Sequence, residues 1–199
     1  MSVRIAVLAS GRGSNLQALI DHFASLGDKG HARIVLVASN REGAQALDRA
    51  RSSAIPAHVF NASDDGTSLI ELLRAHDIEM VVLAGYMKRL PPAVIHVYRG
   101  QIVNVHPGLL PEFGGAGMYG AKVHDAVIAS GARTTGVTVH LVDEELDHGP
   151  TIAQWKIQVR PGDTPESLAS RVLSVEHILY PRAVEMVAAL RHKEFFADF

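Results

Sequence analysis

The 199-residue sequence contains no cysteine, which excludes disulfide bonds, thiol nucleophiles and cysteine-ligated zinc. It also lacks any apolar run close to the roughly 20 residues that a membrane-spanning helix needs. Neither sign of charge dominates, because 19 basic residues stand against 21 acidic ones and the formal net charge is -2. We therefore expect no general electrostatic attraction to nucleic acid or to anionic membranes.

The overall composition is that of an ordinary globular protein, with 47% hydrophobic and 20% charged residues. No repeat or linker divides the chain, so we expect one domain over residues 1–199. The first residues, Met1-Ser2-Val3-Arg4-Ile5, lack the basic start, apolar stretch and cleavage site of a signal peptide. A cytoplasmic location is the resulting expectation.

Short runs rich in Val, Ile and Leu alternate with amphipathic segments through the first half of the chain. This alternation predicts an α/β, Rossmann-like fold: a mostly parallel, twisted sheet with helices on both faces. The strands read as almost continuous apolar runs, which is typical of strands buried on both faces. The expected strands are residues 3–9, 33–39, 57–60, 80–84 and 101–105, and the expected helices begin near residue 14, span 43–52 and 64–76, and begin again at 91–92.

The rhythm changes in the second half. After an expected helix at 121–130, residues 135–142 and 151–157 predict a C-terminal antiparallel strand pair joined by a polar turn. Thr164-Pro165-Glu166 then begins a long C-terminal helix that we expect to reach about His192, with proline in the first turn and an acid near the positive end.

One strand ends in a pair of polar side chains. Asn104 and His106 lie two residues apart, so they share one face of the strand, and Pro107-Gly108-Leu109-Leu110-Pro111 stiffens the loop that follows. Open parallel sheets bind ligands beyond the carboxyl ends of their strands. An amide donor beside an imidazole could polarise a carbonyl and stabilise an oxyanion. The alternative is a capping histidine and a loop asparagine that serve only backbone groups.

A glycine-rich turn, Gly11-Arg12-Gly13-Ser14, leads from the first strand into a helix. The unpaired N–H groups of a helix start favour an anion such as phosphate, although a tight turn alone would also use these glycines. A nicotinamide cofactor is disfavoured, because Leu16 replaces the third glycine of the dinucleotide fingerprint and Ser39-Asn40-Arg41 replaces its acid.

The acidic loop from Asp143 to Pro150 should return to the same end of the sheet, where a carboxylate could reach His106. Its alternative interpretation is a solvated hairpin turn. The histidines His124, His140 and His148 lack the helical spacing of a zinc site, so no metal is expected. With no nucleophile elbow either, the sequence favours direct transfer between two bound substrates.

Four segments carry a resemblance to a known family. They are Gly11-Arg12-Gly13-Ser14-Asn15-Leu16-Gln17, Asn104-Val105-His106-Pro107 with Leu109-Leu110-Pro111, Glu145-Leu146-Asp147 with Gly149-Pro150, and Glu176-His177 with Tyr180-Pro181. Together they resemble the phosphoribosylglycinamide formyltransferases, within the wider folate-dependent formyltransferases. The resemblance spans nearly the whole chain, and the first and last segments narrow it within that wider group.

The resemblance implies transfer of a formyl group from 10-formyltetrahydrofolate, a co-substrate, to the amine of glycinamide ribonucleotide in purine biosynthesis. It implies that His106 stabilises the oxyanion and shuttles protons, that Asn104 donates to the formyl oxygen, and that Asp147 raises the basicity of His106 and orders a water. Thr138 and His140 would support these three residues without contacting the substrates themselves.

The resemblance also divides the domain into a phosphate-binding half, at about 1–100, and a catalytic and folate-binding half, at about 101–199. Gly13, Ser14 and Asn15 would hold the ribonucleotide phosphate, and Glu176 would bind the glycinamide end. The folate would contact Asn104 and two further groups of residues: Met87, Lys88, Arg89 and Leu90, and Asp143, Glu144, Glu145, Leu146 and Asp147. Small molecules, rather than nucleic acid or membrane, are the implied partners of a monomer or homodimer.

The chain departs from the commoner family pattern in two places. Ala116, in the Gly114 to Gly120 loop, stands where a lysine is usual, and residues 61–65 lack an arginine that some relatives place near the folate. Two alternatives remain: a formyltetrahydrofolate hydrolase with the same three site residues, which usually carries an extra N-terminal domain, and a non-catalytic nucleotide-binding module. A tRNA formyltransferase would need a further C-terminal domain.

Overall fold

The structure, a computed structural model, describes residues 2–191 of the chain. Seven strands form one sheet, and the helices connect them in chain order. The elements are β1 (Val3–Leu8), α1 (Ser14–Leu26), the short 3₁₀ helix η1 (Gly27–Lys29), β2 (Ala32–Ser39), α2 (Gln45–Ser52), β3 (Ala57–Val59), α3 (Thr67–Ala75), β4 (Met80–Leu83), α4 (Pro92–Val97), β5 (Ile102–His106), α5 (Ala121–Ser130), β6 (Thr134–Leu141), β7 (Thr151–Gln158) and α6 (Pro165–Arg191).

The strand order in the sheet is β3-β2-β1-β4-β5-β6-β7. The first five strands in this order are parallel, whereas β6 runs antiparallel to both β5 and β7. The chain builds the sheet outward from β1 to β3 and then returns to the other side of β1 with β4. The resulting switch point between β1 and β4 opens a crevice at their carboxyl ends, which is where open α/β sheets bind ligands.

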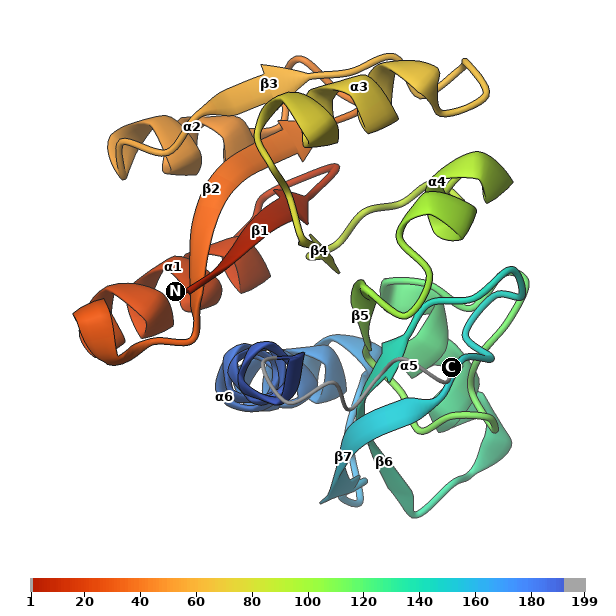
Figure 1. Cartoon of the computed structure of the whole chain (residues 1–199). Helices are drawn as coiled ribbons and strands as arrows, with labels where there is room; N and C mark the ends of the chain where they lie inside the picture. Colours follow the sequence, from red (N-terminus) through yellow and green to blue (C-terminus); the bar gives the residue numbers. More distant parts are fainter. Residues whose placement is uncertain (1, 192–199) are drawn as a thin grey trace.

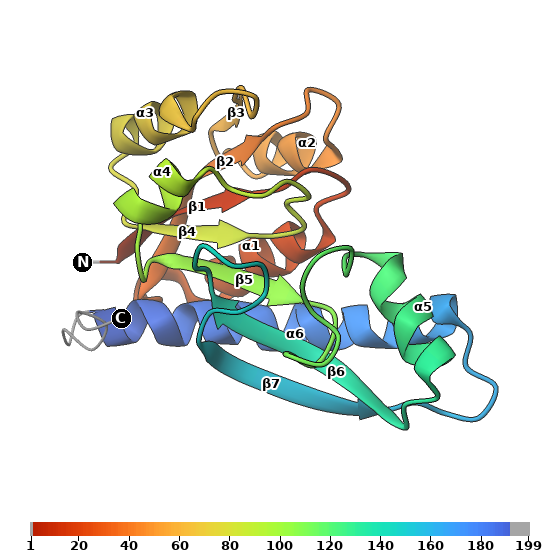
Figure 2. The same ribbon diagram turned by 90° about the vertical axis from the view of Figure 1, so that its right-hand side faces the viewer.

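Helices cover both faces of the sheet, as Figures 1 and 2 show. One core cluster joins alternate residues of β1, such as Ile5 and Val7, to α1, α2, α5 and α6. The other joins Ala6 and Leu8 to α3 and α4. The alternation of side chains along a strand therefore supplies both cores, which explains why β1 has to be apolar at successive positions. Helix α6 packs against the face of the sheet that carries the first of these clusters, and it runs roughly along the direction of the strands (Figure 2).

The predicted fold class and the predicted β6–β7 pair are confirmed, and the elements lie within a few residues of their expected bounds. Helix α3 begins later than expected, at Thr67, because Asp64 and Asp65 instead accept hydrogen bonds from the backbone N–H groups of the turn before it. The antiparallel β5–β6 pairing was not predicted. His192, the expected end of the long helix, lies outside the described residues, and the division into halves stays a prediction. Within residues 2–191, no helix has the length and apolarity to cross a bilayer.

Candidate active site

A cleft of about 630 Å³ opens beyond the carboxyl ends of β1, β4 and β5. It collects most of the residues that the sequence singled out, from segments far apart in the chain. Those lining it are Asn15, Met87, Lys88, Arg89, Leu90, Asn104, His106, His140, Asp143, Glu144, Glu145, Leu146, Asp147 and Glu176. The predicted residues Gly13, Ser14 and Thr138 are not among the lining residues.

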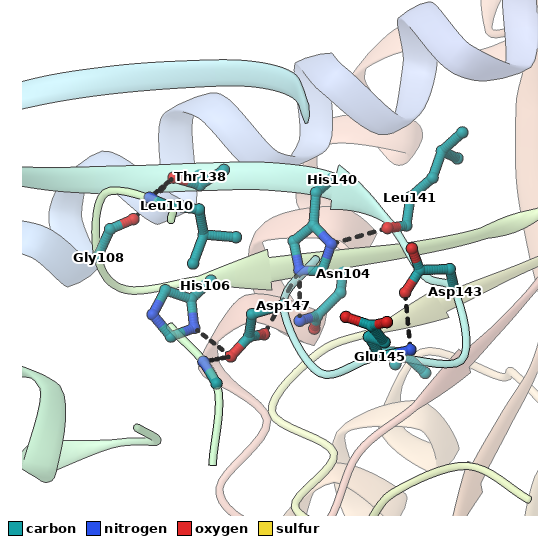
Figure 3. A network of polar contacts seen from close by, with 12 residues as sticks. Asn104, His106, Gly108, Leu110, Thr138, His140, Leu141, Asp143, Glu145 and Asp147 are labelled. Atoms are coloured by element: carbon teal, nitrogen blue, oxygen red, sulfur yellow. Dashed lines mark hydrogen bonds and ion pairs between the residues drawn. The ribbon is translucent and has the colours of Figure 1, made fainter. Parts of the chain in front are cut away.

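Strand β5 presents Asn104 and His106 to the cleft, as predicted from the two-residue spacing (Figure 3). In the antiparallel pairing with β6, Asn104 lies opposite His140 and His106 lies opposite Thr138. This register places four polar side chains at one end of the sheet. His106 is only 3% exposed, and His140 and Thr138 are buried as well.

Both ring nitrogens of His106 have neighbours. Nε2 lies 2.6 Å from the carbonyl oxygen of Phe113, which only accepts, so Nε2 carries a proton and donates it. Nδ1 lies 3.5 Å from Oδ2 of Asp147 (Figure 3). Nδ1 is therefore the nitrogen that can gain or lose a proton, and gaining one completes an ion pair with the carboxylate.

The pKa of His106 lies below its ordinary value, because burial lowers it more than the charge of Asp147 raises it. The charge of Asp147 acts on the pKa of His106 in the direction that the resemblance implies, but the lowering by burial is larger. A neutral imidazole at neutral pH follows from this balance. In the free protein His106 is thus ready to accept a proton rather than already charged.

Asp147 is the centre of the polar network. Its Oδ2 accepts a hydrogen bond of 3.0 Å from the N–H of Gly115, and its Oδ1 lies 3.6 Å from Nε2 of His140. The backbone of Asp147 is left-handed, with φ of 55°, a conformation that Asp and Asn adopt more readily than other non-glycine residues. Burial raises the pKa of Asp147, but the two imidazoles and the Gly115 N–H together lower it further, so the side chain is a carboxylate. The alternative interpretation of this loop as a solvated hairpin turn is therefore wrong for Asp147.

His140 orients the Asn104 amide. Nδ1 of His140 lies 2.8 Å from the carbonyl oxygen of Leu141 and must donate to it. In the neutral ring Nε2 is then an acceptor, and Nδ2 of Asn104 donates to it across 3.1 Å (Figure 3). This bond fixes which end of the amide faces the cleft and leaves Asn104 a second N–H for a ligand.

Thr138 braces the proline-rich loop after β5. Its hydroxyl donates to the carbonyl oxygen of Gly108 at 2.7 Å and accepts from the N–H of Leu110 at 3.1 Å. Nε2 of Gln154 in β7 also donates to the same hydroxyl oxygen, at 3.0 Å. The loop that follows His106 is thus tied to the neighbouring strands through one side chain.

At the other end of the cleft, Asn15 and Glu176 form a buried pair. Nδ2 of Asn15 donates to Oε2 of Glu176 at 2.5 Å, although the two residues are 161 positions apart. Burial raises the pKa of Glu176 more than this bond lowers it. Oδ1 of Asn15 has no hydrogen-bond partner among residues 2–191. Unsatisfied buried polar atoms are costly, so this end is prepared for a polar ligand. Ser14 lines a separate depression that is bounded by α1, α2 and α6.

The opposite wall is formed by residues 87–90 and by the acidic loop. The hydroxyl of Ser10, at the end of β1, accepts a hydrogen bond of 2.9 Å from the N–H of Met87 and donates to Oδ1 of Asn40 at 2.6 Å. Arg89 donates from Nη2 to the carbonyl oxygen of Glu144, which links the two parts of this wall across the cleft mouth. The first wall segment is thus held by the strand that leads into the glycine-rich turn.

A third side of the cleft consists of residues to which the sequence assigned no individual role, although the loop from Gly114 to Gly120 was noted. It is formed by the loop before α5 and by the start of that helix: Gly115, Gly117, Met118, Tyr119, Gly120, Ala121 and His124. Ala116 is not among the lining residues. The high glycine content of this loop was the available signal, since a loop that approaches a ligand through its backbone needs small residues. Arg12, an exposed cation in the glycine-rich turn, also lines the cleft and was assigned no role.

Among the described residues, no group of three or more His, Asp or Glu side chains is placed to hold a metal ion. The expected absence of a metal stays a prediction. The chemistry available from the protein itself consists of amide and backbone donors, an imidazole that can take up a proton, and a carboxylate that stabilises the charged imidazole.

A doubly covered sheet with a polar cleft at its switch point defines an α/β protein of Rossmann-like architecture. Residues 3–184 match the formyl transferase family, and the chain belongs to this family. It is 42% identical over 194 residues to a protein of Arabidopsis thaliana named phosphoribosylglycinamide formyltransferase, chloroplastic, covering 94% of this chain and 65% of that protein. The chain thus spans slightly less than two thirds of the length of this relative.

Solved structures agree with the fold. The crystal structure of phosphoribosylglycinamide formyltransferase from Anaplasma phagocytophilum is 38% identical, with a TM-score of 0.87, and the match covers 95% of this chain and 88% of that one. A formyltetrahydrofolate deformylase from Pseudomonas syringae is 28% identical, with a TM-score of 0.83, and the match covers 96% of this chain and 63% of that one. The Rossmann-like architecture is therefore shared by relatives that are named for different activities.

Proposed function

We propose that this protein is an enzyme that transfers the formyl group of 10-formyltetrahydrofolate to the amine of glycinamide ribonucleotide, a step of purine biosynthesis. The observation that carries the proposal is the joined network of Asn104, His106 and Asp147 in the middle of a cleft with two differently built ends. The names of the Arabidopsis and Anaplasma relatives support the same activity.

The reaction requires a carbonyl polariser and a proton carrier. The amine nitrogen of the ribonucleotide attacks the formyl carbon, and the second N–H of Asn104 donates to the oxygen as it becomes an oxyanion. Nδ1 of His106 takes the proton that the attacking nitrogen loses. The C–N10 bond then breaks, the carbonyl re-forms, and His106 returns the proton to N10 of the folate. Asp147 stabilises the charged imidazole between these two steps and orders a water beside it.

The ribonucleotide occupies the end of the cleft at α1. Its phosphate accepts hydrogen bonds from the backbone at Gly13, Ser14 and Asn15, because the first N–H groups of a helix have no partners within it. Glu176 binds the glycinamide end. The buried pair of Glu176 and Asn15, with its unsatisfied amide oxygen, supports this assignment.

The folate occupies the opposite wall. The pterin lies among Met87, Lys88, Arg89 and Leu90 and against the backbone of residues 143–147, with the formyl group directed at Asn104. The contact between Arg89 and the Glu144 carbonyl supports a shared site, since it joins the two segments. The word formyltetrahydrofolate in the name of the Pseudomonas relative supports a folate donor.

A formyltetrahydrofolate hydrolase is the second candidate, favoured by the fold of the Pseudomonas deformylase. Water would then attack in place of the amine, with the same three residues. The Asn15 and Glu176 pair favours the transferase, because a hydrolase needs no site for a second organic substrate. A non-catalytic module is disfavoured, since a cluster of buried polar groups is costly to keep without a ligand.

The deciding experiment incubates the protein with 10-formyltetrahydrofolate, with and without glycinamide ribonucleotide, and follows loss of the formyl group. We expect turnover only when the amine is present, together with stoichiometric formylated ribonucleotide. Turnover without the amine supports the hydrolase, and no turnover in either case supports the non-catalytic module. His106→Ala serves as the site-dead control. The cytoplasmic location stays a prediction, since one relative is named chloroplastic. Sedimentation would distinguish a monomer from a homodimer.

A further inference from the structure

Helix α2 holds two successive carbonyl groups of the glycine-rich turn. The N–H of Ala46 donates to the carbonyl oxygen of Gly11 at 3.1 Å, and Nε of Arg49 donates to that of Arg12 at 2.8 Å. The same guanidinium donates from Nη1 to Oε1 of Gln17 at 3.1 Å, one turn into α1. Arg49 therefore connects the turn to the helix that follows it.

This arrangement determines where the next N–H points. In a planar trans peptide the C=O and N–H bonds lie on opposite sides of the chain. Because Arg49 holds the Arg12 carbonyl toward α2, the N–H of Gly13 points away from α2. Among residues 2–191, no hydrogen bond uses the N–H groups of Gly13, Ser14 or Asn15, so these donors are left for a ligand.

Gly13 makes this close approach possible. Its φ is 73°, and a Cβ at this position would lie 2.9 Å from Cα of Ala46 and 3.3 Å from Cδ of Arg49. The turn and α2 are thus in direct contact, and a side chain at residue 13 would separate them. The stem of Arg49 packs against the turn, so the position of the guanidinium is fixed by packing as well as by hydrogen bonds.

The charge of Arg49 is not neutralised by a carboxylate. Among the ion pairs of the described residues, none includes Arg49. Asp21 lines the same depression as Arg49 and Ser14, but its Oδ1 accepts from Nε2 of Gln17. Arg51, two residues further along α2, instead pairs with Asp48 at 2.9 Å on the exposed surface. An unpaired guanidinium beside free backbone donors suits a dianionic group.

We propose that Arg49 is a positioning residue that directs the Gly13 N–H at the phosphate of the ribonucleotide and contributes uncompensated positive charge to that site. This inference rests on the proposed function and adds a residue to it. Arg49 sets the preference for a phosphorylated substrate, whereas Asn104, His106 and Asp147 carry the chemistry.

The test compares two variants. Arg49→Met removes both the guanidinium donors and the charge, whereas Arg49→Lys keeps only the charge. Arg51→Gln is the matched control from the same helix. We expect KM for glycinamide ribonucleotide to rise about ten- to a hundredfold in Arg49→Met, the range that loss of a charge-assisted hydrogen bond gives. We expect kcat and the KM for the folate to change less than about threefold, because ground-state binding is what is lost.

Arg49→Lys distinguishes the effect on the direction of the Gly13 N–H from the effect of the positive charge. A lysine cannot donate from a fork to both Arg12 and Gln17, so we expect KM for the ribonucleotide to remain several-fold above wild type. A wild-type KM in Arg49→Lys would overturn the positioning role. Gln17→Ala, which frees one arm of the guanidinium, should give a smaller rise and keeps the test open if Arg49→Met does not fold.

A substrate without phosphate separates recognition from general damage. With glycinamide ribonucleoside, Arg49→Met should match wild type within about twofold, so that the wild-type preference for the phosphorylated substrate shrinks about ten- to a hundredfold. Equal losses on both substrates would show a merely structural role and would overturn the proposal. Arg51→Gln should leave the preference unchanged.

Calorimetric binding of ribose 5-phosphate distinguishes failure of this inference from failure of the proposed function. Suppose that ribose 5-phosphate binds at least tenfold more weakly to Arg49→Met than to the wild type, and that the wild type transfers no formyl group. This result would support the phosphate site and reject the proposed activity. Formyl transfer with binding that does not depend on Arg49 would reject the site assignment alone. Circular dichroism of each variant checks that the fold is retained.

Discussion

Replacing Asp147 by Asn tests whether the proposed proton carrier depends on a neighbouring charge. The two side chains have the same shape, and both tolerate the left-handed backbone at this residue. The change removes the charge that lies 3.5 Å from Nδ1 of His106 and 3.6 Å from Nε2 of His140. The protonated state of His106, which forms only during turnover, loses its counter-ion.

The magnitude follows from this distance and from burial. Two unit charges 3.5 Å apart attract by about 5 kcal/mol at an effective dielectric constant of about 20, before the cost of burying them is subtracted. An opposite charge at this range typically moves a pKa by roughly one to three pH units, or about 1.4–4 kcal/mol. Because the His106 side chain is 4% exposed and that of Asp147 is 14% exposed, solvent screens the pair weakly. We therefore expect kcat to fall by about ten- to a thousandfold.

The assay is steady-state formyl transfer across a pH series. In wild type, kcat/KM should fall at low pH as His106 becomes protonated in the free enzyme. Asp147 raises the pKa of His106, so its removal should move this acidic limb to lower pH while the plateau drops. An Asp147→Asn enzyme with near-normal kcat, or with the limb moved upward, would refute the proposed role. Glu112→Gln, an exposed carboxylate outside the cleft, is the matched control.

Three further changes test other parts of the site. His106→Ala should lower kcat about a hundred- to a thousandfold with KM little changed, and a normal rate would exclude proton transfer by this imidazole. Glu176→Gln should raise KM for the ribonucleotide. Burial raises the pKa of Glu176, so the protonated side chain contributes stability at low pH, and this contribution is lost as pH rises through the folded-state pKa. Melting curves from pH 4 to 8 should show this loss of stability in the wild type and not in the variant. Thr138→Val should cost about 1–3 kcal/mol of unfolding free energy, measured in urea, because the Leu110 N–H loses its acceptor; an unchanged midpoint would contradict the bracing role.

Most of the fold could be predicted because local patterns determine it. Buried parallel strands must be apolar on both faces, so β1, β4 and β5 are visible as runs of Val, Ile and Leu. The antiparallel pairing of β5 with β6 could not be predicted from a local pattern. It depends on how α5 returns the chain, and the strand composition is compatible with either direction.

The site was predictable where it follows strand geometry and not where it depends on distant contacts. The shared direction of Asn104 and His106 follows from their spacing on one strand. The pairing of Asn15 with Glu176 joins residues 161 positions apart, and no periodicity links them. The lowered pKa of His106 depends on the balance between burial and one carboxylate, which only the packed structure determines. The sequence assigns no role to Arg49, because its two acceptors lie in the turn before α1 and in α1, outside its own helix.

The left-handed backbone of Asp147 restricts which residues can occupy this position, independently of the reaction. Gly, Asn and Asp reach this conformation at the lowest cost, and only Asp among them carries a charge. A glutamate would keep the charge but would add a methylene in a crowded region, where a Cβ built on Gly114 would lie only 3.1 Å from Cβ of Asp147. The backbone conformation and the proposed catalytic role therefore both favour Asp at this position. A saturation library at position 147 should return Asp for both reasons. Among the inactive variants, Asn should be the one that folds best.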